Sequence, residues 1–236
     1  ASCHPAGKLL HMKSILLSVL FWAPAPILAC DLALVLAVDV SGSVDRAEYR
    51  TQMQGLATGL RDGIVADALV DQSSKVTLIQ WSGSSRQHQT IPWVEINSYA
   101  DVIGLSDKIA DDPRMWRNFS TAIGEALGAS LEALEDVADC TLEVIDVSGD
   151  GVSNEGVEPR SFHAKLKAQN IIVNGLAIET DQTDLTAYFY ENLIVGEGAF
   201  VVTANGFENY PAQIRRKLQR ETAKRTSALV QSPRSR

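Results

Sequence analysis

Apolar, β-branched segments alternate along the chain with segments of helical periodicity, and this alternation limits the folds that the sequence can adopt. Strands are expected at 31–38, 75–81, 89–96, 141–147, 171–178 and 199–203. Helices are expected at 45–61, 64–70, 98–110, 120–137, 159–169, 185–193 and 207–222. Strands that alternate with helices form a mostly parallel sheet flanked by helices, with ligands at the carboxyl ends of the strands. We therefore predict an α/β, doubly wound fold with a mostly parallel six-stranded sheet.

Two of these strands carry information about their place in the sheet. The segment 171–178 is a continuous apolar run, which is typical of a strand that is buried on both faces. The segment 89–96 contains Pro92, which has no amide hydrogen to donate to a neighbouring strand. We therefore expect 171–178 inside the sheet and 89–96 at its edge.

The amino-terminal segment has the pattern of a targeting sequence. Met12 and Lys13 precede an apolar run at 15–29 that ends in a small residue, Ala29. A charged start, an apolar stretch and a small residue at the cut are typical of a secretory signal peptide. The run is too short and too broken by prolines for a membrane span. We predict a signal peptide at 12–29; the alternative is a buried apolar helix.

The predicted signal peptide sets the other boundaries of the chain. Residues 1–11 contain no initiator Met and are interpreted as a non-native upstream extension. The mature protein then begins near Cys30, has no transmembrane span and lies in the periplasm or outside the cell. One domain of ordinary size occupies 30–225, and 226–236 is expected to be a disordered basic tail.

Charge is distributed unevenly between the body of the chain and its end. Residues 30–210 hold 28 acidic and 11 basic side chains, whereas 211–236 hold 8 basic side chains and one acidic side chain. An acidic body repels nucleic-acid phosphates and anionic lipid. Nucleic acid is therefore not expected as the main partner.

Cys30 and Cys140 are the two cysteines of the predicted mature chain, and each opens a strand-like run. The runs end at Asp39 and Asp150, at nearly equal distances from their cysteines. If the two strands are parallel neighbours, both cysteines lie at one end and both aspartates at the other. A disulfide is then geometrically natural in an oxidising compartment. Two alternatives stay open: lipid anchoring of Cys30 after a lipoprotein-type cut, and two unpaired buried thiols.

Oxygen-bearing side chains follow two of the expected strands. Asp39, Ser41 and Ser43 alternate through a tight turn, and Asp150 stands in a second glycine-flanked turn. Thr121 adds a hydroxyl at an expected helix start. Oxygen ligands that converge in this way suit a hard cation such as Mg²⁺. The alternative for the first turn is a helix cap, but three such sites at strand ends favour a metal.

These five residues resemble the metal-ion-dependent adhesion site of von Willebrand factor type A domains. The resemblance covers about 190 residues in the family's element order and fills all five positions of the motif. It implies the Rossmann-like fold of that family. The amino-acid sequences at 31–41 and 144–151 are similar to a bacterial, secreted branch of the family whose function is unknown. The chain departs from the family in the loop before Thr121, where Phe119 and Ser120 stand in place of a common glycine pair.

The resemblance implies a role for each residue of the site. Ser41, Ser43 and Thr121 would contact Mg²⁺ or Mn²⁺ directly, whereas Asp39 and Asp150 would act mainly through bound water. Neutral hydroxyls leave the charge of the ion largely uncompensated, so an open position would attract a carboxylate of a partner protein. The implied function is a secreted, non-catalytic protein-binding module, with movement of the last helix as a possible response.

The hypothesis that the protein is an enzyme has less support in the sequence. His88 and His163, the histidines of the predicted mature chain, do not form a spaced ligand pair. Gly149 and Gly151 lack the third glycine of a dinucleotide fingerprint, and a Gly-x-Ser-x-Gly nucleophile turn is absent from the sequence. The alternative function is a secreted hydrolase that uses Asp39 and Asp150 around a metal.

The loop at 111–118 leads into Thr121 and is therefore expected on the metal face. Arg114, Trp116 and Arg117 are candidate partner contacts, because exposed Trp and Arg side chains often dominate protein interfaces. The alternative is that Trp116 packs inward beneath the loop.

Overall fold

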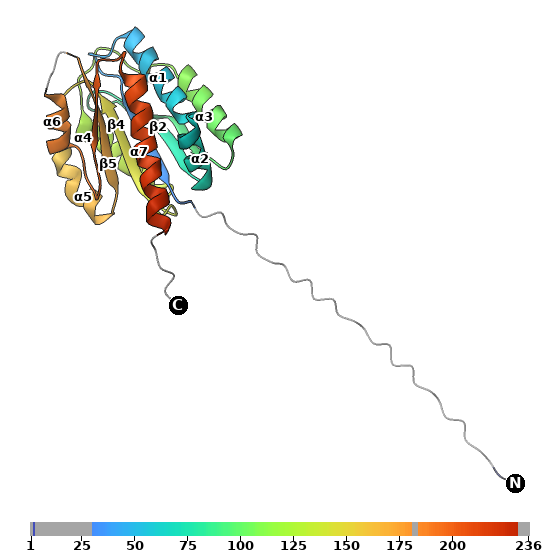
Figure 1. Ribbon diagram of the computed structural model, residues 1–236. Helices are drawn as coiled ribbons and strands as arrows, with labels where there is room; N and C mark the ends of the chain where they lie inside the picture. Colours follow the sequence, from blue (N-terminus) through green and yellow to red (C-terminus); the bar gives the residue numbers. More distant parts are fainter. Residues whose placement is uncertain (1, 3–29, 181–183, 231–236) are drawn as a thin grey trace.

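A single six-stranded sheet with helices on both faces forms the body of the protein (Figure 1). The computed structural model describes residue 2, residues 30–180 and residues 184–230. The strand order is β3-β2-β1-β4-β5-β6. The predicted upstream extension and signal peptide, apart from residue 2, lie outside the described residues. Within the described part of the chain, no helix is long and apolar enough to cross a membrane.

The centre of the sheet is β1, with β2 on one side and β4 on the other. The strands are β1 (Ala33–Asp39), β2 (Lys75–Trp81), β3 (Gln87–Glu95), β4 (Glu143–Gly149), β5 (Ile172–Glu179) and β6 (Val201–Asn205). All neighbours pair in parallel except β2 and β3. Chain connections leave β1 in both directions, so the sheet is doubly wound and the point where the strand order reverses lies between β1 and β4. The sheet, the buried β5 and the edge strand with Pro92 are as predicted.

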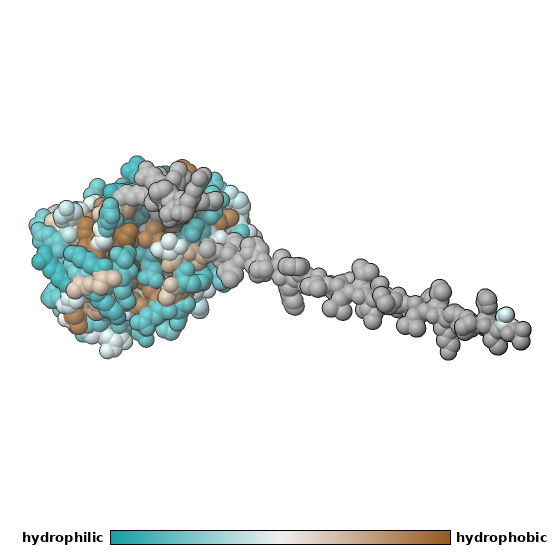
Figure 2. All heavy atoms as spheres, turned by 90° about the horizontal axis from the view of Figure 1, so that it is seen from below, coloured by the Kyte–Doolittle hydropathy of each residue, from teal (hydrophilic) through white to brown (hydrophobic). Residues whose placement is uncertain are grey.

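The helices form two layers, one on each face of the sheet (Figure 1). One layer holds α1 (Arg46–Leu60), α2 (Gly63–Asp71), α3 (Tyr99–Asp111) and α7 (Tyr210–Val230). The other holds α4 (Ile123–Glu135), α5 (His163–Ala168) and α6 (Leu185–Asn192). Successive residues of β1 point into opposite layers, so two apolar cores form and the strand is buried throughout. On the surface in Figure 2, hydrophilic residues surround smaller apolar areas.

Two helices depart from expectation in their kind or in their length. The helix predicted at 159–169 begins as a 3₁₀ turn, Pro159–Phe162, and becomes α-helical at His163, because Pro159 presets the first turn but donates no hydrogen bond. The last helix continues to Val230, into the segment predicted as a disordered tail. Residues 223–230 contain neither Pro nor Gly, and the first helix breaker is Pro233. Residues 231–236 lie outside the described residues.

Cys30 and Cys140 form a disulfide, with their Cα atoms 4.5 Å apart. The bridge joins the segment before β1 to the segment before β4, and both cysteines are buried. The backbone continues this contact, because Thr141 N donates to Cys30 O at 2.9 Å. The disulfide predicted from the matched spacing is therefore present. A lipid thioether would need the same sulfur atom of Cys30.

Candidate metal centre

The turn that follows β1 collects its oxygen atoms through local hydrogen bonds. Asp39 is the last residue of the strand and is fully buried. Its Oδ1 accepts from Ser41 N at 2.7 Å, and the Oγ atoms of Ser41 and Ser43 are 3.2 Å apart. Ser43 is exposed, so the turn opens to solvent. Three oxygen-bearing side chains thus gather within one turn.

Helix capping does not explain this turn. The cap of α1 is Asp45, whose side chain accepts from Ala47 N and Glu48 N, while Glu48 closes a reciprocal capping box. Asp39, Ser41 and Ser43 therefore remain available for another role, which removes the main alternative for the motif.

The turn after β4 brings Asp150 to the same place. Ser43 Oγ donates to Asp150 Oδ1 at 2.6 Å. A Cβ atom on Gly149 would lie 3.0 Å from Asp39 Oδ2, so a larger residue there would push the two turns apart. Parallel pairing of β1 with β4 makes this approach possible, because the carboxyl ends of both strands meet at one edge.

Thr121 comes from the loop before α4 and is fixed by its backbone. Thr121 N donates to Asn154 Oδ1 at 2.9 Å, and Thr121 O accepts from Asn154 N at 2.9 Å. A Cβ atom on Gly151 would lie 3.6 Å from Thr121 Oγ1, which places this hydroxyl beside the Asp150 turn. The structure therefore brings all five predicted residues together. Asn154, which holds Thr121, was not predicted, because nothing in its local sequence marks it.

The electrostatics of the site fit a bound cation. Asp39 Oδ2 is buried and has no hydrogen-bond partner in the described structure. Burial and then the negative charge of Asp150 raise the pKa of Asp39 to about 7. Burial also raises the pKa of Asp150. A cation would compensate both carboxylates, and the donor set of three hydroxyls and two carboxylates suits a hard divalent ion.

Carboxylate-rich or histidine-rich alternatives are not found in the part of the chain that the structure describes. No group there of three or more His, Cys, Asp or Glu side chains could hold a metal ion. His163 Nε2 is 2.9 Å from Asn192 O, and His88 lies on the edge strand β3, so neither belongs to the cluster of five.

The raised pKa of Asp39 makes the stability of the metal-free protein depend on pH. Because the folded pKa of about 7 lies above the ordinary 3.8, the contribution of Asp39 is complete below the ordinary value and is lost as pH rises through 7. The free energy of unfolding in EDTA should therefore fall from about pH 4 to pH 8. Urea titrations of the wild type and of Asp39→Asn test this. The fall should be smaller in Asp39→Asn, and an equal fall in both would contradict the assignment.

The three predicted partner contacts have different positions. Arg114 Nη2 donates to Val40 O at 3.0 Å and to Ser41 O at 2.8 Å, so this side chain supports the turn that holds Ser41 and Ser43. Trp116 is half-buried and packs against the core below α1, α3 and α7. Arg117 is exposed. Trp116 therefore packs inward, as the alternative prediction stated. Of the three side chains, Arg117 is the most exposed to solvent.

The loop before Thr121 reaches its conformation without the common glycine pair. Asn118 has φ of 59°, in the left-handed region that Asn tolerates better than most residues. Phe119 O accepts from Gly42 N at 2.8 Å, and the guanidinium carbon of Arg86 lies 3.6 Å from the centre of the Phe119 ring. The contact between Arg86 and Phe119 was not predicted, because the two residues lie 33 positions apart in the sequence.

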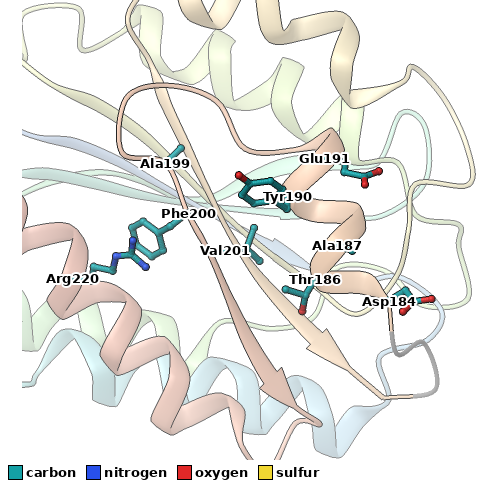
Figure 3. A pocket seen from close by; sticks show the side chains of 9 residues that line it. All are labelled: Asp184, Thr186, Ala187, Tyr190, Glu191, Ala199, Phe200, Val201 and Arg220. Carbon is teal, nitrogen blue, oxygen red and sulfur yellow. The ribbon is translucent and has the colours of Figure 1, made fainter.

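A hollow of about 610 Å³ lies elsewhere, along the edge strand β6. Figure 3 shows its lining: Tyr190 of α6 points toward Phe200, and Arg220 of α7 lies on the other side of Phe200. None of the five clustered residues lines this hollow. It is separate from the candidate metal centre.

A family model described as "Protein of unknown function (DUF1194)" matches residues 29–226. The chain belongs to this family. Among curated proteins, none matches this DUF1194 member.

Solved structures similar to this DUF1194 member include those of three proteins. Proximal thread matrix protein 1 from the mussel byssus, in a structure with a zinc-occupied metal-ion-dependent adhesion site, has 16% identity and a TM-score of 0.60. The match covers 83% of this chain and 46% of that one. A von Willebrand factor type A protein from Catenulispora acidiphila has 14% identity and a TM-score of 0.55, over 83% of this chain and 42% of that one.

The third structure is the pilus adhesin SpaC from Lactobacillus rhamnosus GG, with 13% identity and a TM-score of 0.57 over 84% of this chain and 30% of that one. The DUF1194 chain therefore spans less than half the length of each of these proteins. Together the likenesses show the von Willebrand factor type A fold, which the motif resemblance predicted.

Proposed function

We propose that the protein is a secreted, metal-dependent protein-binding module in which Mg²⁺ or Mn²⁺ bridges to a carboxylate of the partner. Ser41, Ser43 and Thr121 would contact the ion directly, and Asp39 and Asp150 would act mainly through water. The observation that carries the proposal is the convergence of these five side chains around the unpartnered, buried Asp39 Oδ2. The cation would neutralise the two carboxylates and keep an open coordination position toward solvent.

Binding is favoured over catalysis by the burial of the acids. Asp39 is fully buried and Asp150 is nearly so. This burial keeps both carboxylates away from a substrate that approaches from solvent. The histidines of the described chain lie outside the cluster and offer no general base there. The fold is shared with a pilus adhesin and a thread matrix protein, which supports an interaction role by analogy.

An extracytoplasmic location is supported by two independent features. The Cys30–Cys140 disulfide is typical of an oxidising compartment. The predicted signal peptide at 12–29 supplies the route of export. The proposed location is therefore the periplasm or the outside of the cell.

A pull-down from the exported proteome tests the proposed function. The protein is immobilised and exposed to the proteome with Mg²⁺ and again with EDTA, and a Thr121→Val variant serves as the matched control because valine is isosteric but offers no oxygen ligand. We expect partners that are retained by the wild type with Mg²⁺ and lost in EDTA and in the variant. Equal retention in all conditions would reject metal-bridged binding. Ester or phosphoester turnover that disappears in Asp150→Ala would instead favour the hydrolase alternative.

A further inference from the structure

We propose that the face around the metal centre selects an acidic peptide segment with two carboxylates, one for the cation and one for a clamp formed by Arg86 and Arg117. This inference rests on the proposed function and narrows the class of partner. It follows from the position, charge and packing of two arginines that the metal chemistry does not use.

Arg86 is held in place by an exposed aromatic ring. Its guanidinium carbon lies 3.6 Å from the ring centre of Phe119, which is 38% exposed. Arg86 Nη1 also donates to Ser84 O at 3.3 Å. Stacking covers one face of the guanidinium group and leaves its edge for a bidentate contact with a carboxylate. A group fixed in this way loses little conformational entropy when it binds.

The stacked pair lies next to the metal centre. Phe119 O accepts from Gly42 N, and Gly42 stands between Ser41 and Ser43. The turn that carries Arg86 is bound to the same loop, because Ser82 Oγ donates to Ser120 O at 3.1 Å and Ala122 N donates to Ser82 O at 3.0 Å. Thr121 lies between these two contacts, so Arg86 belongs to the rim of the metal centre.

Arg117 adds a second charge to this rim. It is exposed and precedes Asn118, whose Cα would lie 3.3 Å from a Cβ on Gly42. Arg114, three positions earlier in the same loop, donates to the carbonyl oxygen of Ser41. The backbone of Arg117 therefore lies next to the turn that holds Ser41 and Ser43, and its exposed side chain belongs to the rim of the candidate metal centre.

Neither arginine is neutralised within residues 30–180 and 184–230. The four ion pairs there involve Arg61, Lys75 and Lys217, but not Arg86 or Arg117. Two acidic side chains lie nearby without an ion pair to either arginine: Glu48 is engaged in the capping box of α1, and Glu155 Oε2 would lie 2.5 Å from a Cβ atom on Gly83. On a body with 28 acidic and 11 basic side chains, two arginines outside the described ion pairs stand beside the candidate cation site. Such a rim complements an acidic ligand and disfavours a neutral one.

Labelled glycine-rich peptides with one aspartate or with two aspartates at varied spacing serve as probes. Fluorescence anisotropy measures their binding to the Mg²⁺-loaded protein and to the protein in EDTA. We expect the best two-aspartate peptide to bind at least about tenfold more tightly than the one-aspartate peptide, and only with Mg²⁺. Arg86→Gln and Arg117→Gln should each remove most of this advantage. Arg50→Gln, an exposed arginine of α1, is the matched control and should retain it.

Calorimetric titration with Mg²⁺ alone distinguishes a failure of the arginine clamp from a failure of the proposed metal centre. Mg²⁺ affinity should be similar in the wild type and in both arginine variants, because neither side chain is a proposed ligand. If Mg²⁺ binds but both peptide classes bind equally, or neither binds, the clamp is rejected and the metal centre stands. An advantage that survives in both arginine variants also rejects the clamp. If Mg²⁺ does not bind to the wild type, the proposed function itself fails.

Discussion

Replacing both Cys30 and Cys140 with serine is expected to lower the free energy of unfolding by about 4 to 5 kcal/mol. The disulfide closes a loop of 110 residues, and the chain-entropy model assigns a loss of this order when such a loop is opened. For a domain of this size the melting temperature should fall by roughly 10 to 20 °C. Both cysteines are buried and serine is close to cysteine in size, so the substitutions leave no large cavity.

Reductant supplies the matched control for this prediction. Wild-type protein with reductant should show a similar fall in melting temperature, whereas the double serine variant should not respond to reductant. Intact mass of the exported protein should rise by the mass of two hydrogens on reduction. An acyl group on Cys30, or a melting temperature that reductant leaves unchanged, would contradict the disulfide and favour lipid anchoring.

Substituting Lys217 with methionine is expected to destabilise the protein by about 3 to 5 kcal/mol, because the change removes one partner of a buried ion-pair cluster. Lys217 on α7 is fully buried and pairs with Asp146 of β4, and its Nζ lies 3.0 Å from Glu221 Oε1. Asn174 Nδ2 of β5 donates to the same Glu221 oxygen at 2.6 Å. Burial disfavours the charge on Lys217, but the two carboxylates raise its pKa above the ordinary lysine value.

Urea denaturation measures this effect, with Arg216→Met as the control on the same helix. Arg216 is exposed, so its substitution should change the free energy of unfolding by about 0.5 kcal/mol or less. Adding Asp146→Asn and Glu221→Gln to Lys217→Met should recover part of the loss, because no buried charge is then left without a partner. A loss no larger than that of Arg216→Met would show that the cluster does not fix α7.

The same cluster limits how α7 could respond to binding at the candidate metal centre. Lys217 ties the helix to β4, and Glu221 ties it to β5 through Asn174. A shift of α7 along the sheet would separate these groups inside the core, where unpaired charges are costly. We therefore expect α7 to stay in place unless the cluster is rearranged.

The fold could be predicted from the sequence because local pattern and global arrangement agree. Apolar strands, Pro92 at the edge and helical stripes each identify their element without knowledge of distant contacts. The three-dimensional role of Lys217 could not be predicted in the same way. A lysine in an amphipathic helix normally belongs to the solvated face, and its partner Asp146 lies 71 positions away in the sequence.

The candidate metal centre was partly predictable for a related reason. Asp39 and Asp150 follow strands, and parallel pairing places both strand ends together, so their meeting follows from the fold. The role of the loop at 111–118 was less predictable, because it depends on the orientation of its side chains. Arg114 donates to the carbonyl oxygen of Ser41 and Trp116 packs into the core, and neither orientation is encoded in a local pattern.

Calorimetric titration of the metal-free protein with Mg²⁺ tests the central claim most directly. The wild type should bind one ion, and an Asp39→Ala, Asp150→Ala double variant should lose most of its affinity, because both buried carboxylates that face the cation are gone. An Asp111→Ala, Asp136→Ala variant is the matched control, since it removes two exposed carboxylates and the same charge. It should bind Mg²⁺ as the wild type does. Full Mg²⁺ affinity in the Asp39→Ala, Asp150→Ala variant would contradict the proposed metal centre.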